Sequence, residues 1–425
     1  MEGQAPEYIS HSNTEISHHK VEPGLRQEET VLSSATSPFK AQAYLPWSSF
    51  VLALILCLTS VASLVTPAVY CLTVSDSITL GPGENKVTSL AMEGTTLYAG
   101  MNTFPGIVAR INTVSMRTAG PSLKLSDGEN SIYSLLVVDG YLYAGLYTSP
   151  GKIVKIDTGS FSKVEVLTLR EGENWITCLA ASDGFLYAGL RMFPGKIVKI
   201  NLRTFQRVDL LELAPGENNV YSMAIKDRYL YTNIAMRPGG VAKIKLETFQ
   251  EVRSLRLRPG EDYCYALAIS DNLLFLGLYS KPGGIARIDL TIFEQVGSAA
   301  QFSSGEDNVW SLIVHQASVY VGLDSRPGRV LKLDRDLKRL DVLQFNEEES
   351  GVYALVPLNE SLICGLYSSP GRIAILQTQT LPSQTVYPMV ILIVTLSVIV
   401  CIAFIVARKI RSARKSEDLL LMHRN

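Results

Sequence analysis

The sequence predicts an all-β fold, a seven-bladed β-propeller closed by an N-terminal outer strand and flanked by two single transmembrane helices. Three observations support this prediction. A Pro-Gly pair recurs seven times at spacings of 43 to 45 residues, four strand-like runs fill each period, and apolar runs without charge stand at both ends of the repeats. Repeats of this length, built from short strands, are typical of propeller blades. The prolines are Pro105, Pro150, Pro194, Pro238, Pro282, Pro327 and Pro370.

Composition divides the chain into six parts. They are a cytosolic disordered tail at 1–47, a transmembrane helix or signal anchor at 48–72, the propeller at 73–376, a linker at 377–387, a second transmembrane helix at 388–407 and a basic cytosolic tail at 408–425.

The first apolar run follows a polar tail rich in Ser, Thr, Glu and His. Such a tail lacks the apolar periodicity of a folded segment. No charged residue occurs between Lys40 and Asp76, and the run is long enough to cross a hydrocarbon core about 30 Å thick. A cleaved signal peptide is the alternative, with Ser-Val-Ala-Ser as its cleavage site. The tail is long and more acidic than basic, which favours an uncleaved anchor.

The second apolar run sets the orientation. It is free of charge from Arg372 to Arg408 and is followed at once by the basic stretch RKIRSARK. Positive charge beside a span stays in the cytosol. Both termini are therefore expected in the cytosol, and the repeats outside the cell or in a lumen, at the plasma membrane or an endomembrane. The sequon Asn359-Glu360-Ser361 falls in this part, which predicts a glycoprotein.

The repeat from Asn174 to Glu217 shows the four strands of one blade, named a to d. WITCLAA and FLYAGL are joined by Ser-Asp-Gly, and Asp-Gly is a strong signal for a tight hairpin. KIVKIN follows the Pro-Gly loop and alternates apolar with basic residues, as a half-buried strand does. FQRVDLLEL completes the unit. A single blade cannot bury both of its faces, whereas seven in a ring can.

The run LYAG, loop, KIVKIDTGSFSKVEVL resembles the YVTN-type repeat of the seven-bladed propeller superfamily, which is related to WD40-like repeats. The resemblance covers about residues 73–376. It implies the fold and says little of function, because propellers carry many unrelated activities.

The closure of the ring is predicted from the ends of the repeats. Residues 72–80 stand where each later repeat places strand d, while the seventh repeat ends near Leu376 after three good strands. The N-terminal strand should therefore complete the seventh blade. Both membrane tethers would then leave from the face of the a–b turns, with the face of the b–c and d–a loops pointing away from the bilayer.

The first candidate site is a binding face on the loops before each Pro-Gly pair, where the repeats differ. Variable loops on a rigid scaffold are common recognition sites. Drift at solvated loop tips would give the same variation. The predicted residues, a basic and apolar arc on consecutive blades, are Arg191, Met192, Phe193, Met236, Arg237, Tyr279, Lys281 and Arg326.

The second candidate site is an acidic ring at the channel mouth, made by the Gly-Glu that precedes each inner strand. Oxygen ligands suit Ca²⁺, and lactonase-type propeller hydrolases use acidic residues at the channel. Turn chemistry repeated in every blade would also explain the motif. No resident cofactor is expected, with Ca²⁺ as the alternative. The residues are Glu84, Glu129, Glu173, Glu217, Glu261 and Glu306.

The sequence thus favours a membrane-anchored recognition module for a protein or a glycan, with a channel-mouth enzyme or ion-binding protein as the alternative. A net charge of −1 argues against nucleic acid as a partner. The bilayer is a further partner, through the two helices. Six cysteines without paired spacing predict buried free thiols, and no histidine cluster or catalytic motif appears in the repeats.

Overall fold

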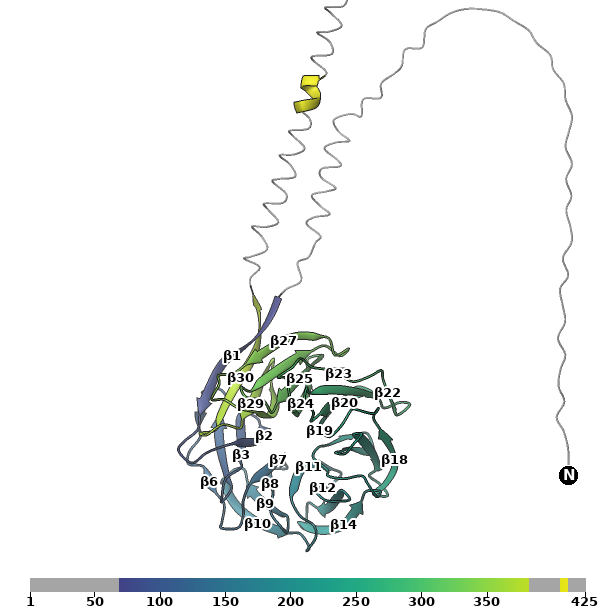
Figure 1. The fold of residues 1–425 in the computed structure, drawn as a ribbon. Helices are drawn as coiled ribbons and strands as arrows, with labels where there is room; N and C mark the ends of the chain where they lie inside the picture. The colour runs from purple at the N-terminus through teal and green to yellow at the C-terminus, as the bar shows by residue number, and fades with distance from the viewer. Residues whose placement is uncertain (1–68, 382–405, 412–425) are drawn as a thin grey trace, which may run out of the picture. The chain divides into compact units, whose positions relative to one another are not determined.

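The computed structural model describes residues 69–381 and 406–411. Residues 69–381 form seven antiparallel sheets arranged around a central channel, as Figure 1 shows. The predicted all-β, seven-bladed propeller is therefore confirmed. In six sheets the strands follow one another in sequence from the channel outward, so each of these blades is one repeat, and in the seventh the outermost strand comes from the N-terminal end of the propeller.

The blades are built from short strands. From the channel outward, blade 1 has β2 (Val87–Glu93), β3 (Thr96–Met101), β4 (Ile107–Asn112), β5 (Arg117–Thr118) and β6 (Leu123–Lys124), and blade 2 has β7 (Ile132–Val138), β8 (Tyr141–Leu146), β9 (Lys152–Asp157) and β10 (Ser162–Thr168). Blade 3 has β11 (Ile176–Ser182), β12 (Phe185–Leu190), β13 (Lys196–Asn201) and β14 (Gln206–Glu212), and blade 4 has β15 (Met223–Lys226), β16 (Tyr229–Ile234), β17 (Gly240–Lys245) and β18 (Gln250–Arg256). Blades 5 to 7 are β19 (Cys264–Ser270), β20 (Leu273–Leu278), β21 (Gly284–Asp289), β22 (Glu294–Gln295) and β23 (Ala300–Gln301); β24 (Val309–His315), β25 (Ser318–Leu323), β26 (Arg329–Leu333) and β27 (Arg339–Gln344); and β28 (Val352–Leu358), β29 (Ser361–Leu366), β30 (Arg372–Leu381) and β1 (Val69–Thr79).

The predicted membrane spans at 48–72 and 388–407 lie almost wholly outside the described residues. The exceptions are residues 69–72, which belong to β1, and residues 406–407, which begin a short helix at 406–411. Within the described ranges, no helix is long and apolar enough to cross a membrane.

The N-terminal strand completes the seventh blade, as the sequence predicts. β1 pairs antiparallel with β30, from Val69 opposite Leu381 to Thr79 opposite Arg372. The sheet extends beyond the predicted limits of the propeller at both ends, because each strand supplies backbone partners for the other.

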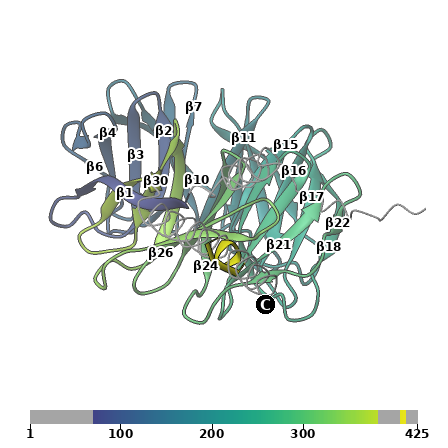
Figure 2. The ribbon, with the colours of Figure 1, turned by 90° about the horizontal axis from the view of Figure 1, so that it is seen from above.

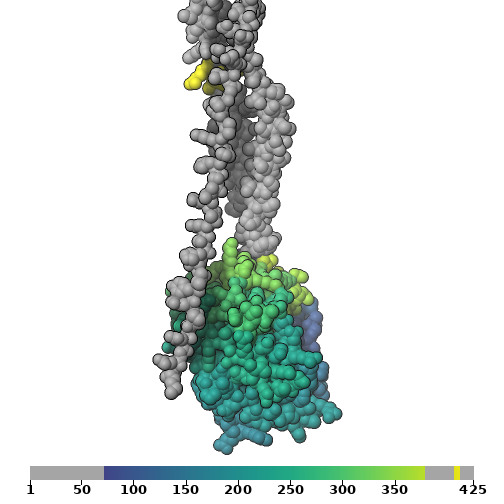
Figure 3. All heavy atoms as spheres, turned by 90° about the vertical axis from the view of Figure 1, so that its right-hand side faces the viewer, coloured from purple at the N-terminus to yellow at the C-terminus, as the bar shows by residue number. Residues whose placement is uncertain are grey.

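The paired ends of β1 and β30 leave at the rim of the ring, in its plane, rather than from the face of the a–b turns (Figure 1). Figure 2 shows β1 running across the outer edge of its blade, and in Figure 3 the yellow-green atoms of the last blade gather at one edge of the propeller. The predicted exit is therefore wrong. Strand twist accumulates across a blade, so the outer strands turn away from the direction of the inner one.

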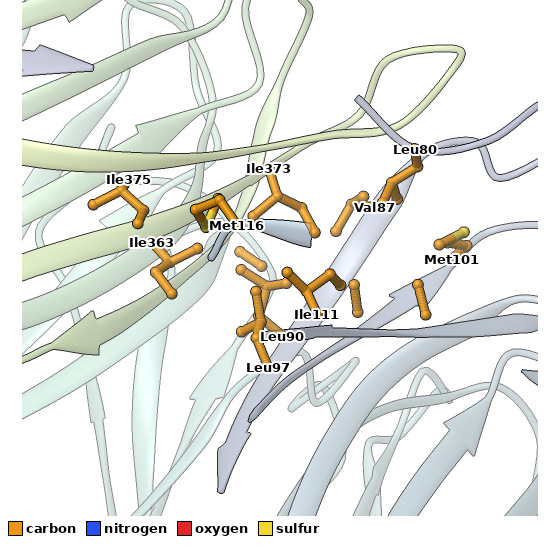
Figure 4. Packing of buried hydrophobic residues seen from close by; sticks show 13 residues of the cluster. Leu80, Val87, Leu90, Leu97, Met101, Ile111, Met116, Ile363, Ile373 and Ile375 are labelled. Atoms are coloured by element: carbon orange, nitrogen blue, oxygen red, sulfur yellow. The ribbon is translucent and has the colours of Figure 1, made fainter. Parts of the chain in front are cut away.

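Each blade is joined to the next by one repeated backbone contact. The N–H of the Pro-Gly glycine donates to the carbonyl of the glutamate that precedes the next blade's inner strand, at distances from 2.6 to 2.8 Å. This glutamate follows a glycine in six blades, and in blade 7 it is Glu349, which follows Glu348. Gly371 makes this bond to Glu84 at 2.7 Å, which joins blade 7 to blade 1. All seven bonds before these prolines are cis peptides. The same seam is filled by a core in which Val87 and Leu97 of blade 1 meet Ile363 and Ile373 of blade 7 (Figure 4).

A glycine near the end of strand b allows neighbouring blades to approach closely. A Cβ built on Gly145 would lie 2.7 Å from Cγ2 of Ile176 in the next blade. Blade 4 has Asn233 at this position, and the next blade there has the smaller Cys264 in place of Ile or Val. The Asn233 side chain donates to the Cys264 carbonyl and accepts from the N–H groups of Tyr221 and Ser222. The carboxamide thus replaces strand pairing where β15 is short.

The predicted buried thiols are confirmed for three cysteines. Cys178, Cys264 and Cys364 are free and buried, and burial raises the pKa of each thiol to about 12.

The side chain of the glutamate before each inner strand makes contacts within its own turn and blade. Six of the seven are buried, and Glu129 accepts a hydrogen bond from the N–H of Ser126 at 2.9 Å. A partner near the start of strand d meets the carboxylate from outside. Lys163 lies 2.9 Å from Glu129, and Arg207 lies 2.7 Å from Glu173. The six buried residues are Glu129, Glu173, Glu217, Glu261, Glu306 and Glu349.

Blade 4 departs from this pattern by placing Glu251 where Lys163 and Arg207 stand in other blades. The Glu251 carboxyl faces the carboxyl of Glu217, which also lies 3.7 Å from Arg256. Burial and the neighbouring Glu217 raise the pKa of Glu251 to about 7, against the bonds that it accepts from Ala214 and Ser254. Blade 4 therefore holds a pair of carboxyl groups that favours a shared proton.

The close blade contact predicts that Gly145→Ala lowers the free energy of unfolding by about 1–3 kcal/mol, because the new methyl overlaps Ile176. Gly159→Ala is the matched control. It lies in an exposed turn with no close neighbour but Asp157, so its effect should stay within about 1 kcal/mol. Denaturant unfolding of both variants measures the difference. Equal stability of the two variants would contradict the contact.

The carboxyl pair predicts an unusual pH dependence. An unfolded Glu has a pKa of about 4.3, so between that pH and about 7 only the folded protein keeps the proton on Glu251. Stability from this group is therefore present at acid pH and lost as the pH rises through about 7. Glu251→Gln should remove that loss, so its thermal midpoint should exceed the parent's at about pH 8 but not at about pH 5. Glu294→Gln, which changes an exposed carboxyl on β22, is the control and should leave the thermal midpoint unchanged at both pH values. If the midpoints of the parent and of Glu251→Gln depend on pH in the same way, the carboxyl pair is refuted.

Candidate functional site at the mouth of the central channel

The inner strands of all seven blades surround a cavity of about 340 Å³. In six blades its walls are the second, third and fourth residues of the inner strand, and in blade 4, where β15 begins only at Met223, they are Tyr221, Ser222 and Met223. The residue before these three, such as Ile132 or Val309, is fully buried between blades. The first of the three lining residues is the second position of the pattern Val87-Thr88-Ser89 and its equivalents in the other blades. This position is aromatic in five blades, as Tyr133, Tyr221, Tyr265, Trp310 and Tyr353.

Blades 1 and 3 have threonine at the second position. The Thr88 hydroxyl donates to the carbonyl of Gly100, at 3.2 Å, and to that of Ile132 in blade 2. Thr177 makes the equivalent bonds to Gly189, at 3.1 Å, and to Val220. Threonine therefore serves the contact with the next blade, whereas the aromatic residues face the cavity.

A ring of backbone hydrogen bonds fixes the loops around the mouth. The residue after Gly-Glu-Asn has positive φ, for example +58° at Trp175. Its N–H donates to the previous blade's b–c loop, as Trp175 does to Thr148 at 2.9 Å, and its carbonyl accepts from the residue after strand b, as from Arg191 at 3.0 Å. The mouth therefore has two further side-chain positions per blade on a fixed backbone, and those positions vary in sequence.

Six aromatic residues at the mouth form two stacks. They are Tyr221, Tyr265 and Tyr279 in the first stack and Trp310, Tyr353 and Tyr367 in the second. Ring centres within each stack are 4.0 to 4.3 Å apart. The two stacks meet where Trp310 stands nearly perpendicular to Tyr265 and Tyr279, at 72° and 68°. A smaller group, with Tyr147 between Tyr133 and Trp175, lies on blades 2 and 3.

Charged groups divide the mouth into unlike halves. Asp324, the residue after β25, accepts a hydrogen bond from the Tyr279 hydroxyl at 3.1 Å. Arg191 donates to the Tyr147 hydroxyl. The Lys86 ammonium lies 5.3 Å from the centre of the Tyr367 ring. Basic side chains therefore lie on blades 1 and 3, and the carboxylate on blade 6.

The tyrosine hydroxyls remain protonated donors at neutral pH. Burial raises the pKa of Tyr133 to about 12, with a smaller contribution from Tyr367 and Tyr147. Burial, followed by the charge and hydrogen bond of Asp324, raises the pKa of Tyr279 and of Tyr353. The mouth thus offers fixed hydroxyl donors among apolar rings, a surface suited to binding.

The predicted binding residues separate into three groups. Arg191 and Tyr279 lie at the mouth. Phe193, Arg237, Lys281 and Arg326 are exposed at loop tips, where Arg237 also lies 3.5 Å from Asp262. Met192 and Met236 pack against the cores of their blades. The loops are therefore where the sequence places them, but these two methionines serve packing.

The predicted acidic ring does not surround the cavity. Glu84, Glu129, Glu173, Glu217, Glu261 and Glu306 are absent from its lining. All but Glu84 are buried, and the described contacts are with turn amides, neighbouring side chains or both. Among the described residues, no group of three or more His, Cys, Asp and Glu side chains could hold a metal ion. These contacts fit the alternative interpretation of the motif, in which the glutamates stabilise a turn in every blade. Asn359 lies exposed in the turn between β28 and β29, so the sequon is accessible.

Apart from Tyr279, the mouth aromatics and Asp324 are not among the residues that the sequence predicts, although a signal for them exists. In the inner strands the residue after the invariant Val, Ile or Cys is aromatic in five blades and threonine in two. A strand packed between blades on one face has no structural need for a large ring on the other. The residues missed as site residues are Tyr133, Tyr147, Trp175, Tyr221, Tyr265, Trp310, Asp324, Tyr353 and Tyr367.

The fold is similar to that of solved propellers. A crystal structure of RRP9 WD40 repeats has a TM-score of 0.56 and 12% sequence identity, over 72% of this chain and 100% of that chain. The computationally designed Ika8 protein has a TM-score of 0.50 and 16% identity, over 70% and 98%. No family model and no curated protein matches the sequence. The chain therefore has the seven-bladed β-propeller fold, in a form similar to WD40-repeat propellers.

Proposed function

We propose that this chain is a membrane-anchored recognition module whose propeller, outside the cell or in a lumen, binds a protein ligand at the mouth of its channel. The observation that carries the proposal is the asymmetric set of aromatic and charged side chains on a backbone that repeats in every blade. Aromatic residues and Arg are the types enriched in binding hot spots. A feature needed only for the fold would be the same in all blades.

A protein segment is favoured over a glycan by the arrangement of the rings. Within each stack, aromatic faces cover one another, as Trp310 and Tyr353 do at 4.3 Å. A sugar ring packs on an open aromatic face, whereas ring edges and tyrosine hydroxyls suit the backbone and polar side chains of a peptide. The exposed loop residues Phe193 and Arg237 would widen the contact around the mouth.

Membrane anchoring is supported by the two apolar runs and by the geometry of their attachment. The described ends of β1 and β30 pair side by side, so the segment before β1 and the segment after β30 are attached at adjacent points on blade 7. One blade at the rim would thus be tied to the membrane. The basic stretch after Arg408 supports a cytosolic C-terminus.

The test places single cysteines in the full-length protein in sealed vesicles of native orientation. Ser149→Cys lies at an exposed loop tip of the mouth, and Ser160→Cys lies in an exposed turn of the same blade away from the mouth. A membrane-impermeant maleimide carrying a photocrosslinker should label both from the non-cytosolic side. Only Ser149→Cys should then form a discrete protein adduct.

A second substitution assigns the adduct to the mouth. Adding Arg191→Ala should reduce adduct formation about tenfold, the effect of losing roughly 1.4 kcal/mol at a hot spot. Arg203→Ala, an exposed residue of the same blade, should leave it unchanged. Labelling from the cytosolic side alone would contradict the topology. Equal adducts at both cysteines would contradict the binding face.

A further inference from the structure

We propose that the corner between the two aromatic stacks binds an organic cation, with Asp324 as its counter-charge. The inference rests on the proposed function, since the cation would be a basic side chain or the amino terminus of the protein ligand. Its chemistry, a guanidinium or ammonium group, can be tested without knowing that ligand.

Asp324 is held in place by residues of both neighbouring blades. The hydroxyl of Tyr279 in blade 5 donates to it at 3.1 Å, and the ring of Tyr353 in blade 7 lies close to it beside Gly351. A carboxylate can accept about four hydrogen bonds, so the Tyr279 donor orients the group and leaves it able to accept more.

The charge of Asp324 is not matched by a cation of the propeller. Among the ion pairs of the described residues, none includes Asp324. Arg191 is bonded to Tyr147, and Arg237 pairs with Asp262 at 3.5 Å. A partly buried carboxylate without a cation gains from the arrival of one.

The surrounding rings add to this attraction, because the faces of Trp and Tyr rings attract cations. Tyr265, Trp310 and Tyr353 also line the cavity of about 340 Å³, so corner and cavity share walls. Trp310 presents a plane at 68° to that of Tyr279. A guanidinium at this corner would donate to the carboxylate while it lies beside the rings.

Gly351 leaves room above the carboxylate. It occupies the mouth position where the other blades carry side chains such as Lys86 and Trp175. A Cβ there would lie 2.6 Å from the ring of Tyr353 and 3.1 Å from Oδ1 of Asp324. Any other residue would therefore press on the two groups that form the proposed site.

The experiment follows the fluorescence of Trp310 in the full-length protein, with Trp47→Phe and Trp175→Phe making it the sole tryptophan. The probes are acetyl-arginine amide, acetyl-lysine amide and the neutral isostere acetyl-citrulline amide. A saturable change in fluorescence is expected with a cationic probe. The citrulline probe is expected to bind with an affinity at least about tenfold lower. This comparison needs no substitution at the corner between the two stacks.

Substitutions locate the binding. Asp324→Asn should weaken the cationic probe about tenfold while leaving the citrulline probe unchanged. Asp127→Asn, an exposed carboxylate in the loop before blade 2, is the control and should have no effect. Lys86→Met should not weaken binding. The proposal fails if citrulline binds as well as arginine, if Asp324→Asn binds as the parent does, or if binding appears only after Lys86→Met.

The two proposals fail separately. Saturable cation binding without a protein adduct at Ser149→Cys would leave the cation site standing and refute the proposed ligand class. A protein adduct that Arg191→Ala removes, together with probes that never saturate, would refute the cation site alone.

Discussion

The hydrogen bond from each Pro-Gly glycine to the glutamate carbonyl of the next blade is the contact on which the ring depends. It occurs at all seven blade junctions with nearly constant length, including the junction between blades 7 and 1 that β1 completes. Because backbone groups make it, it requires no particular side chains beyond those that shape the loops. The glutamate side chain then caps its own turn and in several blades meets a partner from strand d.

This division of labour explains how one repeat can carry an asymmetric site. The residues after Gly-Glu-Asn and after strand b are positioned by backbone bonds, so Lys86, Trp175 or Gly351 can occupy equivalent places. The contact between blades 4 and 5 shows that the backbone accepts other changes too. There the larger Asn233 replaces the usual glycine, and the smaller Cys264 replaces the usual Ile or Val. Side chains at the mouth are thus free to serve a ligand.

Sequence periodicity sufficed for the fold because tight turns, alternation and the Pro-Gly period all reflect local contacts. It also gave β1 its place in blade 7. It misplaced the exit of the strands at the rim, since accumulated twist has no sequence signature. The sequence wrongly predicts that the Gly-Glu residues form a ring on the channel. Their burial and their pairing with Lys163 or Arg207 depend on strand d, which the local sequence around each glutamate does not reveal. The sequence does not predict Asp324 as a site residue, because its role at the mouth depends on Tyr279 and Tyr353, which two other blades supply.

Amide hydrogen exchange across the junctions tests the closed ring most directly. The N–H of Gly371, which joins blade 7 to Glu84, should be as strongly protected in the full-length protein as that of Gly151 within the array. Peptides that span each glycine, resolved by mass spectrometry, report both in one sample. Comparable protection is the result that the account predicts. Fast exchange at Gly371 beside slow exchange at Gly151 would show an open seam, and with it a mouth that is not held in one shape.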